Sequence, residues 1–391
     1  MRKFISYICE MLFNQIIGQE HIKNHLQTSA KNGRIPHAQL FIGKEGSGTL
    51  PMAIAYAQFL LSHFSDNPEA SELKVSKLQH PDLHFAFPVT TNDSVKKHPV
   101  SNLFLQEWRD FIKNHPYGSL FNWLRFIGVE NKQGLIGVDE ALEVVKKLQL
   151  KSYEGGFKVM IIWMAEKMNI AASNKLLKLI EEPPEKTIFL LITENEDQII
   201  NTIKSRCQAL HFPVLSEQDI ANALIQREQA SENDALKIAH QAEGNFNKAL
   251  HLLHQDSSDI VFEKWFITWI RSAFKAKGNA AVIQELVVWS ETIAKTGRET
   301  QKQFLEYCLQ FFRQALLLNY KSPDLVFLET QTPKFDLQNF APFVHSENIL
   351  AIEKEISEAM YHIERNGNAK IILLDLSMKL TRFLHKKEAK V

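Results

Sequence analysis

The feature that most constrains the fold is a glycine-rich loop that follows an apolar run. Residues 38–42 are Ala-Gln-Leu-Phe-Ile, and Gly-Lys-Glu-Gly-Ser-Gly follows at residues 43–48. We expect a buried strand over residues 39–42 and an apolar-rich helix over about 51–61. A strand, a glycine loop and a helix in this order are typical of a nucleotide-binding α/β domain, in which backbone N–H groups of the loop cradle phosphates.

The loop lacks the two side chains that act on a γ-phosphate. A working loop places a lysine after its last glycine, followed by a serine or threonine that binds Mg²⁺. Those positions hold Thr49 and Leu50. The remaining candidates for phosphate binding are Gly43, Gly46, Ser47, Gly48 and Thr49. We expect a turn that joins strand to helix and no hydrolysis, with weak anion binding by the loop N–H groups as the alternative.

Length and composition narrow the class of protein. A chain of 391 residues predicts two or three domains. Lys+Arg and Asp+Glu both number 45, which is unlike a protein that binds DNA alone through a basic face. Three distant cysteines without a Cys-x-x-Cys pattern indicate neither a disulfide framework nor a metal site. The absence of a long apolar run and of a signal-peptide pattern leads us to expect a cytoplasmic protein without membrane contact.

Alternating strands and helices predict a doubly wound α/β domain over residues 11–212. Residues 1–10 precede a second methionine and are interpreted as a possible leader. Further strands are expected over 158–163 and 187–193, and a helix over 171–181 that two prolines end. A helix from about 138 to 148 is expected to bury a stripe formed by Val138, Leu142, Val145 and Leu148.

Two helical segments are expected after the α/β domain. Residues 213–257 contain three short helical patterns and predict a small lid domain, and residues 258–391 predict an all-helical domain. A polar stretch at residues 256–258 is a plausible hinge between them.

The segment over residues 62–135 is less regular, and we interpret it as an insertion. Its aromatic residues are Trp108, Phe111, Phe121, Trp123 and Phe126. They offer a stacking platform for single-stranded nucleic acid, but at helical spacing a core role is favoured. His80 and His84 beside Asp82 suggest a metal site, yet without a third spaced ligand the alternating pattern favours an ordinary strand.

Four segments carry a family resemblance when taken together. They are Ile-Gly-Gln-Glu at 17–20, Gly-Arg-Ile-Pro-His-Ala at 33–38, Asn-Lys-Leu-Leu-Lys-Leu-Ile-Glu-Glu-Pro-Pro at 174–184, and Ser205-Arg206-Cys207. Over residues 13–255 the chain resembles the delta-prime subunits of the bacterial DNA polymerase III clamp loader, which belong to the AAA+ family. Beyond residue 258 the resemblance is carried by the helical pattern and by Arg-Asn-Gly-Asn-Ala at 365–369.

The chain departs from an active member of that family at two places besides the loop. Trp163 and Met164 follow the strand where carboxylates would hold Mg²⁺ and position water. Glu166 lies two residues further on and is poorly placed to substitute. Asn247 stands where the family's lid usually carries an arginine. Many relatives also carry a four-cysteine zinc module, which this sequence lacks, so no metal is expected.

The resemblance implies that Arg206, in the Ser205-Arg206-Cys207 motif, is an arginine finger for the ATP site of a neighbouring subunit. A guanidinium suits this task because it is permanently charged and offers a rigid fork of donors to phosphate oxygens. The alternative is a structural salt bridge at an interface. For Glu181 and Glu182, a solvated helix end is favoured over general-base work.

The implied protein is a clamp-loader subunit with an AAA+ α/β domain, a helical lid and a helical collar, without hydrolysis or a cofactor of its own. The resemblance implies a pentameric ring with gamma/tau-like ATPase subunits and a delta-like subunit, which acts on a sliding clamp and primed DNA. Two alternatives stay open: an active gamma/tau-like ATPase, and a nucleic-acid-binding adaptor outside replication. The subunit's position in the ring and the role of residues 62–135 are left undetermined.

Overall fold

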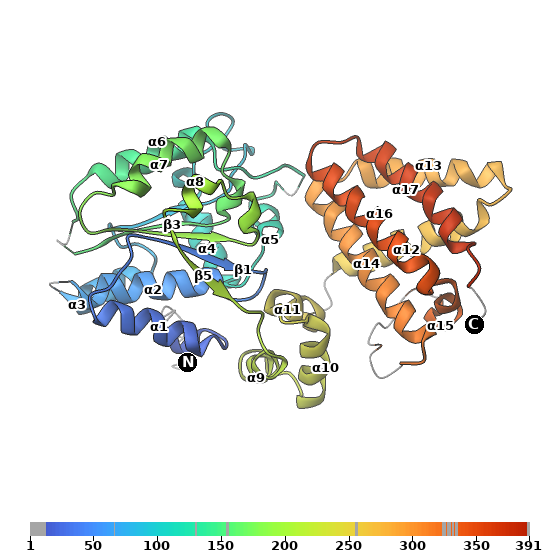
Figure 1. Cartoon of the computed structure of the whole chain (residues 1–391), viewed down its shortest axis with the longest axis horizontal. Helices are drawn as coiled ribbons and strands as arrows, with labels where there is room; N and C mark the ends of the chain where they lie inside the picture. Colours follow the sequence, from blue (N-terminus) through green and yellow to red (C-terminus); the bar gives the residue numbers. More distant parts are fainter. Residues whose placement is uncertain are drawn as a thin grey trace. The chain divides into compact units, whose positions relative to one another are not determined.

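The computed structural model describes residues 13–65, 67–129, 131–153, 156–254, 257–322, 326, 330, 332 and 335–388. The possible leader at residues 1–10 lies outside them. The chain divides into a first compact unit up to residue 253 and a second from residue 254 onward, residues 130–132 excepted (Figure 1). The two units are described separately.

The first unit is built on a five-stranded sheet with the order β2-β3-β4-β1-β5. Its strands are β1 Ala38–Gly43, β2 Leu83–Ala86, β3 Lys158–Ile162, β4 Thr187–Thr193 and β5 Gln208–Phe212. All four strand pairings are parallel. A parallel sheet requires crossover connections, here mostly helical, and both of its faces are covered. The predicted fold class, an AAA+ doubly wound domain followed by helical domains, is confirmed.

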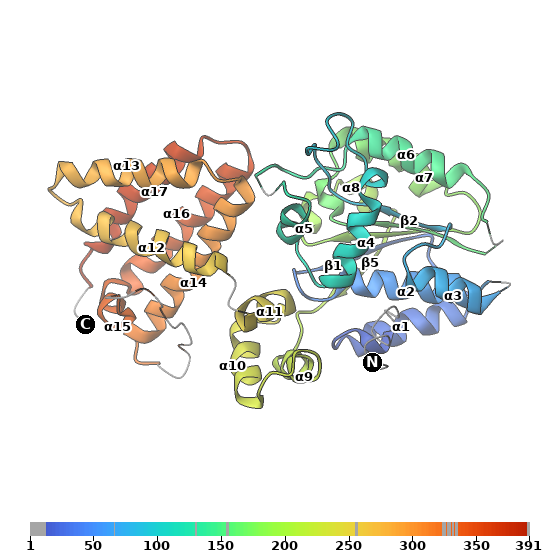
Figure 2. The ribbon, with the colours of Figure 1, turned by 180° about the vertical axis from the view of Figure 1, so that it is seen from behind.

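Helices cover both faces of the sheet. One layer contains α1 Glu20–Lys31, α2 Thr49–His63, α3 Pro68–Ser76, α4 Leu105–Asn114 and α5 Leu120–Phe126. The other contains α6 Val138–Gln149, α7 Ile170–Glu181 and α8 Asn201–Lys204. Figure 1 shows α1 and α2 on the opposite side of the sheet from α6 and α7, and Figure 2 brings α4 and α5 into view from behind. Alternate strand residues serve the two cores, because successive side chains point to opposite faces.

Helix α6 is present, and its buried face overlaps the predicted stripe in part. Leu148 is fully buried as predicted, whereas Val138 and Leu142 are 41% and 37% exposed. Ala141 and Val144 are buried in their place, so the burial of Val138 and Leu142 was wrongly predicted. The carboxylate of the buried Glu140 accepts a hydrogen bond from the backbone N–H of Ser101, and this contact lies on the inward side of the helix.

The segment 62–135, interpreted from the sequence as an insertion, contributes to the main sheet. Strand β2 lies within it and pairs with β3 over Leu83–Ala86, so the segment supplies an edge strand of the main sheet. Trp108, Phe111 and Trp123 are fully buried in the same core as α1 and α2. Their core role is confirmed; these rings offer no exposed stacking platform.

Three helices follow the sheet in the first unit: α9 Glu217–Glu228, α10 Glu232–Ala242 and α11 Phe246–His254. Ser216 and Ser231 cap the first two, each accepting a hydrogen bond from a backbone N–H three residues on. The three predicted helices are confirmed. We call α9–α11 the lid helices, and the boundary of a separate lid domain at residues 213–257 stays a prediction.

The second unit is helical throughout its described residues. It contains α12 Ser257–Lys275, α13 Ala280–Ala294, α14 Arg298–Asn319, α15 Leu337–Phe340, α16 Ser346–Glu364 and α17 Ala369–Leu384. Buried aromatic rings fill its core, among them Phe266, Trp269, Phe311 and Phe312. The long amphipathic pattern after residue 258 predicted this architecture.

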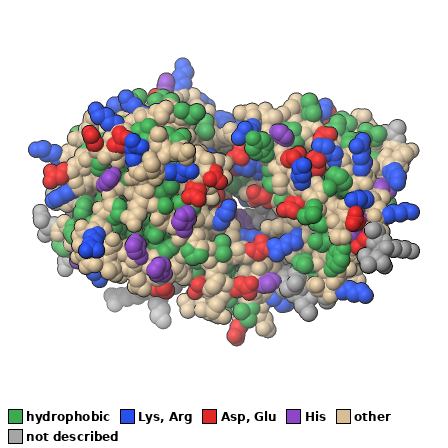
Figure 3. Space-filling model, viewed as in Figure 1, with side chains coloured by type: hydrophobic (Ala, Val, Ile, Leu, Met, Phe, Trp, Pro, Cys, Tyr) green, Lys and Arg blue, Asp and Glu red, His purple; other side chains and the backbone are tan. Residues whose placement is uncertain are grey.

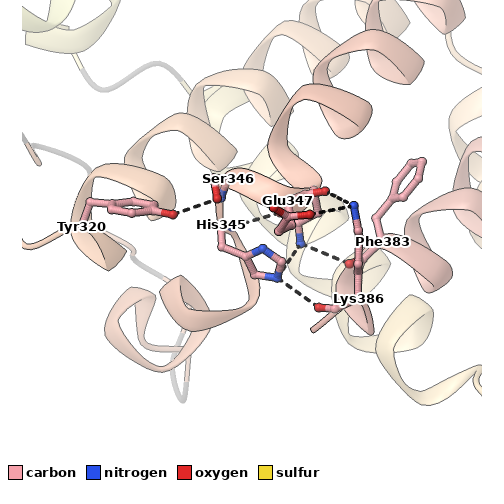
Figure 4. A network of polar contacts seen from close by, with 7 residues as sticks. Tyr320, His345, Ser346, Glu347, Phe383 and Lys386 are labelled. Carbon is pink, nitrogen blue, oxygen red and sulfur yellow. Dashed lines mark hydrogen bonds and ion pairs between the residues drawn. The ribbon is translucent and has the colours of Figure 1, made fainter. Parts of the chain in front are cut away.

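A polar network ties the start of α16 to the residues around the end of α17 (Figure 4). The buried His345 places its Nε2 3.0 Å from the carbonyl oxygen of Lys386. Asn348 donates through Nδ2 to the carbonyl of Phe383, at 3.1 Å. The hydroxyl of Tyr320 accepts from the N–H of Ser346. These bonds satisfy backbone groups that the helix ends would otherwise leave unpaired.

Within the described part of the chain, no helix is both long and apolar enough to cross a membrane. On the face that Figure 3 presents, basic and acidic side chains are intermixed over both units. This distribution agrees with a formal net charge of zero.

Candidate functional site

The glycine loop lies at the carboxyl end of β1, where parallel α/β sheets bind ligands. It leads directly into α2, whose first residue is Thr49. Ser47 is fully buried, and Thr49 and Leu50 are also buried. The Ser47 hydroxyl has no hydrogen-bond partner among the described residues. The loop therefore keeps the predicted strand-to-helix geometry, but its central residues are closed to solvent.

The start of lid helix α11 closes the loop from one side. Glu45 accepts hydrogen bonds through Oε1 from Nδ2 of Asn247 at 2.8 Å and of Asn245 at 3.3 Å. The N–H of Phe246 donates to the carbonyl of Gly46 at 3.3 Å. A Cβ atom on Gly46 would lie only 2.0 Å from Oδ1 of Asn245. The lid asparagines thus contact the loop directly, through the carboxylate of its own Glu45.

Tyr117 closes the loop from another side. Its hydroxyl accepts a hydrogen bond from the N–H of Ile17 at 2.8 Å, and burial raises the pKa of this phenol. Its ring lies 5.0 Å from that of Phe246, edge to face. A Cβ atom on Gly48 would lie 3.2 Å from the same ring. Gln19 adds a hydrogen bond from Nε2 to the carbonyl of Ser47 at 3.1 Å.

Atoms of Asn245, Phe246 and Tyr117 lie close to the loop glycines, and the Glu45 carboxylate would repel phosphate oxygens at close range. Thr49 and Leu50 supply no cation. We assign no chemical step to a nucleotide bound in this loop.

The residues directly after β3, where an active relative would carry metal-binding carboxylates, belong to an aromatic part of the core. Trp163 is 2% exposed, and its ring lies 5.0 Å from that of Trp108. Met164 is buried as well. Neither side chain offers an oxygen to Mg²⁺, which requires oxygen ligands. The segment 62–135 supplies Trp108, and so it helps to build this apolar replacement.

Glu166 is engaged with the chain after β4. Its Oε1 accepts a hydrogen bond from the N–H of Glu194 at 3.3 Å. Burial raises the pKa of this carboxyl. The other oxygen is buried without a partner among the described residues. The carboxyl is thus held by the backbone after β4 and is not directed into the loop region as a free ligand.

The His80, Asp82 and His84 group has a structural role. The Asp82 carboxylate accepts from the N–H of Tyr153 at 3.0 Å, which holds the loop before β3. Burial lowers the pKa of His84 to about 4. Across the described residues, no group of three His, Cys, Asp or Glu side chains is arranged to hold a metal ion.

Arg206 lies between α8 and β5, and its side chain is 35% exposed. Its guanidinium forms an ion pair with Glu181 and donates through Nη1 to the carbonyl of Thr202 at 2.8 Å and to the hydroxyl of Ser205 at 3.2 Å. Cys207 is half-buried, and burial raises the pKa of its thiol to about 11. Within the motif, Ser205 therefore orients the arginine and Cys207 packs inward.

The arginine and the glycine loop lie at opposite ends of the neighbouring strands β5 and β1. In the parallel pairing of β1 with β5, Gln39 faces Gln208 and Gly43 faces Phe212. Arg206 precedes the start of β5, whereas the loop follows the end of β1. With a rise of about 3.3 Å per residue, the paired strands alone separate them by roughly 13 Å.

Two contacts of this site were not predicted from the sequence. Tyr117 carries no motif, and its partner Ile17 is 100 residues away in the chain. Glu181 was interpreted as part of a solvated helix end, yet it pairs with Arg206. No local pattern signals either contact.

Comparison with known proteins agrees with the resemblance. The family model described as DNA polymerase III, delta subunit, matches residues 18–216. The DNA polymerase III subunit tau of Bacillus subtilis is 29% identical over 62% of this chain and 37% of its own length. The subunit delta' of the same organism is 30% identical over 54% of this chain and 52% of its own length.

The subunit delta' of Escherichia coli is 35% identical over 33% of this chain and 38% of its own length. The chain thus spans about half or less of these curated relatives. A solved DNA polymerase III gamma-subunit-related protein from Thermotoga maritima aligns with 92% of this chain and 99% of its own, at 16% identity and a TM-score of 0.33. By the match over residues 18–216, the chain belongs to the clamp-loader family described as DNA polymerase III, delta subunit.

Proposed function

We propose that this chain is a non-hydrolysing, delta-prime-like subunit of a bacterial replicative clamp loader. It supports the ATP-dependent loading of a sliding clamp onto primed DNA, and it acts in the cytoplasm within a pentameric ring. Its neighbours in that ring are gamma/tau-like ATPase subunits and a delta-like subunit. The chain itself needs no cofactor.

The observation that carries this proposal is the closure of the glycine loop by the protein's own side chains. Asn245 and Asn247 bind Glu45 of the loop, and Tyr117 packs against Gly48. These contacts support a loop that is held by the protein and carries out no phosphate chemistry. The apolar Trp163 gives independent support, because a hydrolysing site requires carboxylates at that position.

The similarity to tau subunits keeps an active ATPase as the second candidate. The two candidates differ in the hydrolysis rate of the isolated chain. We expect no measurable turnover from the purified protein. Thr49→Lys should not restore turnover either, because Mg²⁺ positioning and water activation would still be missing.

Arg206 is the residue through which the chain takes part in catalysis, by completing the ATP site of a neighbouring subunit. Its separation from the chain's own loop supports a role in trans, since a phosphate that it contacts must belong to another chain. Its partial exposure supports access by that phosphate. A guanidinium stabilises the charge that develops on the transferring phosphoryl group.

The test is a complex reconstituted from this chain and the clamp-loader subunits of its own organism. An arginine finger contributes about 10³–10⁵ in rate, so Arg206→Ala should abolish most hydrolysis at one interface. DNA-stimulated clamp loading is the more sensitive measurement, because other interfaces carry their own arginines. Arg206→Lys should rescue little, since an ammonium lacks the bidentate fork. Clamp loading by the Arg206→Ala complex at the unmodified rate would overturn the finger role.

A further inference from the structure

We propose that Glu181 is a positioning residue for Arg206, fixing the guanidinium in the orientation in which it meets the neighbour's phosphate. The inference rests on the proposed role of Arg206 in trans and adds a second residue to that site. It concerns a carboxylate in the last turn of α7, whose first interpretation was a solvated helix end.

The geometry is a three-point clamp on one guanidinium. Glu181 pairs with Nη2, while Nη1 donates to the carbonyl of Thr202 at 2.8 Å and to the hydroxyl of Ser205 at 3.2 Å. A guanidinium carries five N–H donors. Three are engaged, and two have no partner within the described residues. Two donors on a fixed plane, on Nε and Nη2, are left to meet phosphate oxygens.

The clamp is mounted on rigid elements. Helix α7 is capped at its start by Asn169, whose side chain accepts from the N–H of Ala172 at 2.8 Å, and Ile180 is fully buried near its end. Helix α8 is anchored by the fully buried Ile203. Groups supported by secondary structure hold a reactive geometry more closely than loop residues do.

The ion pair also stabilises the charge of Glu181 at the end of its helix. A carboxylate in the last turn of a helix is disfavoured by the negative end of the helix dipole. The positive charge of Arg206 offsets this for Glu181. The arginine side chain has many accessible rotamers. The clamp restricts these rotamers before a phosphate binds, so less side-chain conformational entropy is lost in the transition state.

The expected size of the effect is modest, because the pair is partly exposed. The side chains of Arg206 and Glu181 are 35% and 39% exposed, and ion pairs of this kind are weak. Removing the carboxylate should therefore lower the hydrolysis rate at this interface by about two- to five-fold. The change should fall on kcat and leave KM for ATP unaltered, since positioning acts in the transition state.

The experiment is a double-mutant cycle in the reconstituted complex, with assembly checked by gel filtration. The variants are Glu181→Ala, Arg206→Ala and the double variant. Glu182→Ala is the matched control, because Glu182 is the adjacent exposed carboxylate and has no ion-pair partner in the described part of the chain. DNA-stimulated clamp loading and the kcat and KM for ATP are measured for each complex.

The proposal predicts that Glu181→Ala lowers kcat alone, that Glu182→Ala behaves like the wild type, and that Glu181→Ala has no further effect once Arg206 is alanine. If Arg206→Ala is impaired while Glu181→Ala matches the wild type, the positioning role is overturned and the proposed function stands. If Glu181→Ala impairs the Arg206→Ala complex further, Glu181 acts by another route and the proposal fails. If Arg206→Ala itself loads clamps normally, both the finger and its positioning residue are overturned.

Discussion

Adding one methyl group at Gly46 should release the lid helices from the glycine loop. A Cβ atom there would lie 2.0 Å from Oδ1 of Asn245 and 2.7 Å from the backbone nitrogen of Phe246. The asparagine side chain can rotate away, but the backbone of Phe246 cannot. Gly46→Ala should therefore displace the start of α11 and disrupt the hydrogen bonds that Glu45 accepts from the lid.

The loss of stability expected for Gly46→Ala has two parts, and a matched glycine separates them. Gly46 and Gly128 share a backbone φ of +71°, and nothing lies within 4 Å of a Cβ on Gly128. Gly128→Ala should cost about 1–2 kcal/mol for the left-handed conformation alone. Gly46→Ala should cost that amount plus about 1–3 kcal/mol for overpacking against the lid. The difference between the two variants isolates the contact between loop and lid.

Hydrogen exchange followed by mass spectrometry measures this difference segment by segment in the full chain. In Gly46→Ala, amides of residues 246–254 should exchange roughly 5- to 150-fold faster than in the wild type, the equivalent of about 1–3 kcal/mol. In Gly128→Ala the same amides should keep the wild-type rate. Equal behaviour of the lid amides in both variants would show that the lid does not depend on its contact with the loop.

Three further predictions concern ionisable and polar groups. Burial lowers the pKa of His84 to about 4, so the folded chain resists a proton that the unfolded chain takes up near pH 6.5. Stability should then fall as the pH drops through this window, by about 1.5 kcal/mol between pH 6.5 and 5. Urea unfolding at both pH values should show that His84→Gln lacks this pH-dependent loss of stability, whereas His37→Gln, a change at an exposed site, retains it. Burial raises the pKa of the Cys207 thiol to about 11, so little of the reactive thiolate is present at pH 8. Alkylation of Cys207 at pH 8 should therefore be about 100-fold slower in the native chain than in the urea-unfolded chain. Equally rapid labelling of the Cys207 peptide in the native chain would contradict this. His345→Ala should destabilise the second unit by about 1–3 kcal/mol, because the carbonyl of Lys386 loses its partner; unchanged exchange in α16 and α17 would count against that role.

The sequence predicted best those elements whose signal is local. The strand Thr187–Thr193 was predicted to the residue, because a β-branched run between two polar stretches leaves few alternatives. The exposure of Val138 and Leu142 in α6 was missed because both fit the same helical period as the face that is actually buried. In the segment 62–135, the alternating pattern predicted the strand β2, but the segment was interpreted as an insertion because the pattern does not say which sheet the strand joins. Its place in the sheet depends on pairing with β3, which no local pattern encodes.

In the proposed function, the closed loop and the exposed arginine have separate tasks: the chain does not hydrolyse ATP, and its arginine serves a neighbouring subunit. The bonds from Asn245 and Asn247 to Glu45 join the loop to the lid helices through side chains of the chain itself, so this arrangement is encoded in the sequence. Arg206 lies at the opposite end of the paired strands β1 and β5 from that loop. Under this proposal the chain presents its arginine in a constant setting, and the state of the interface depends on the nucleotide held by the neighbour.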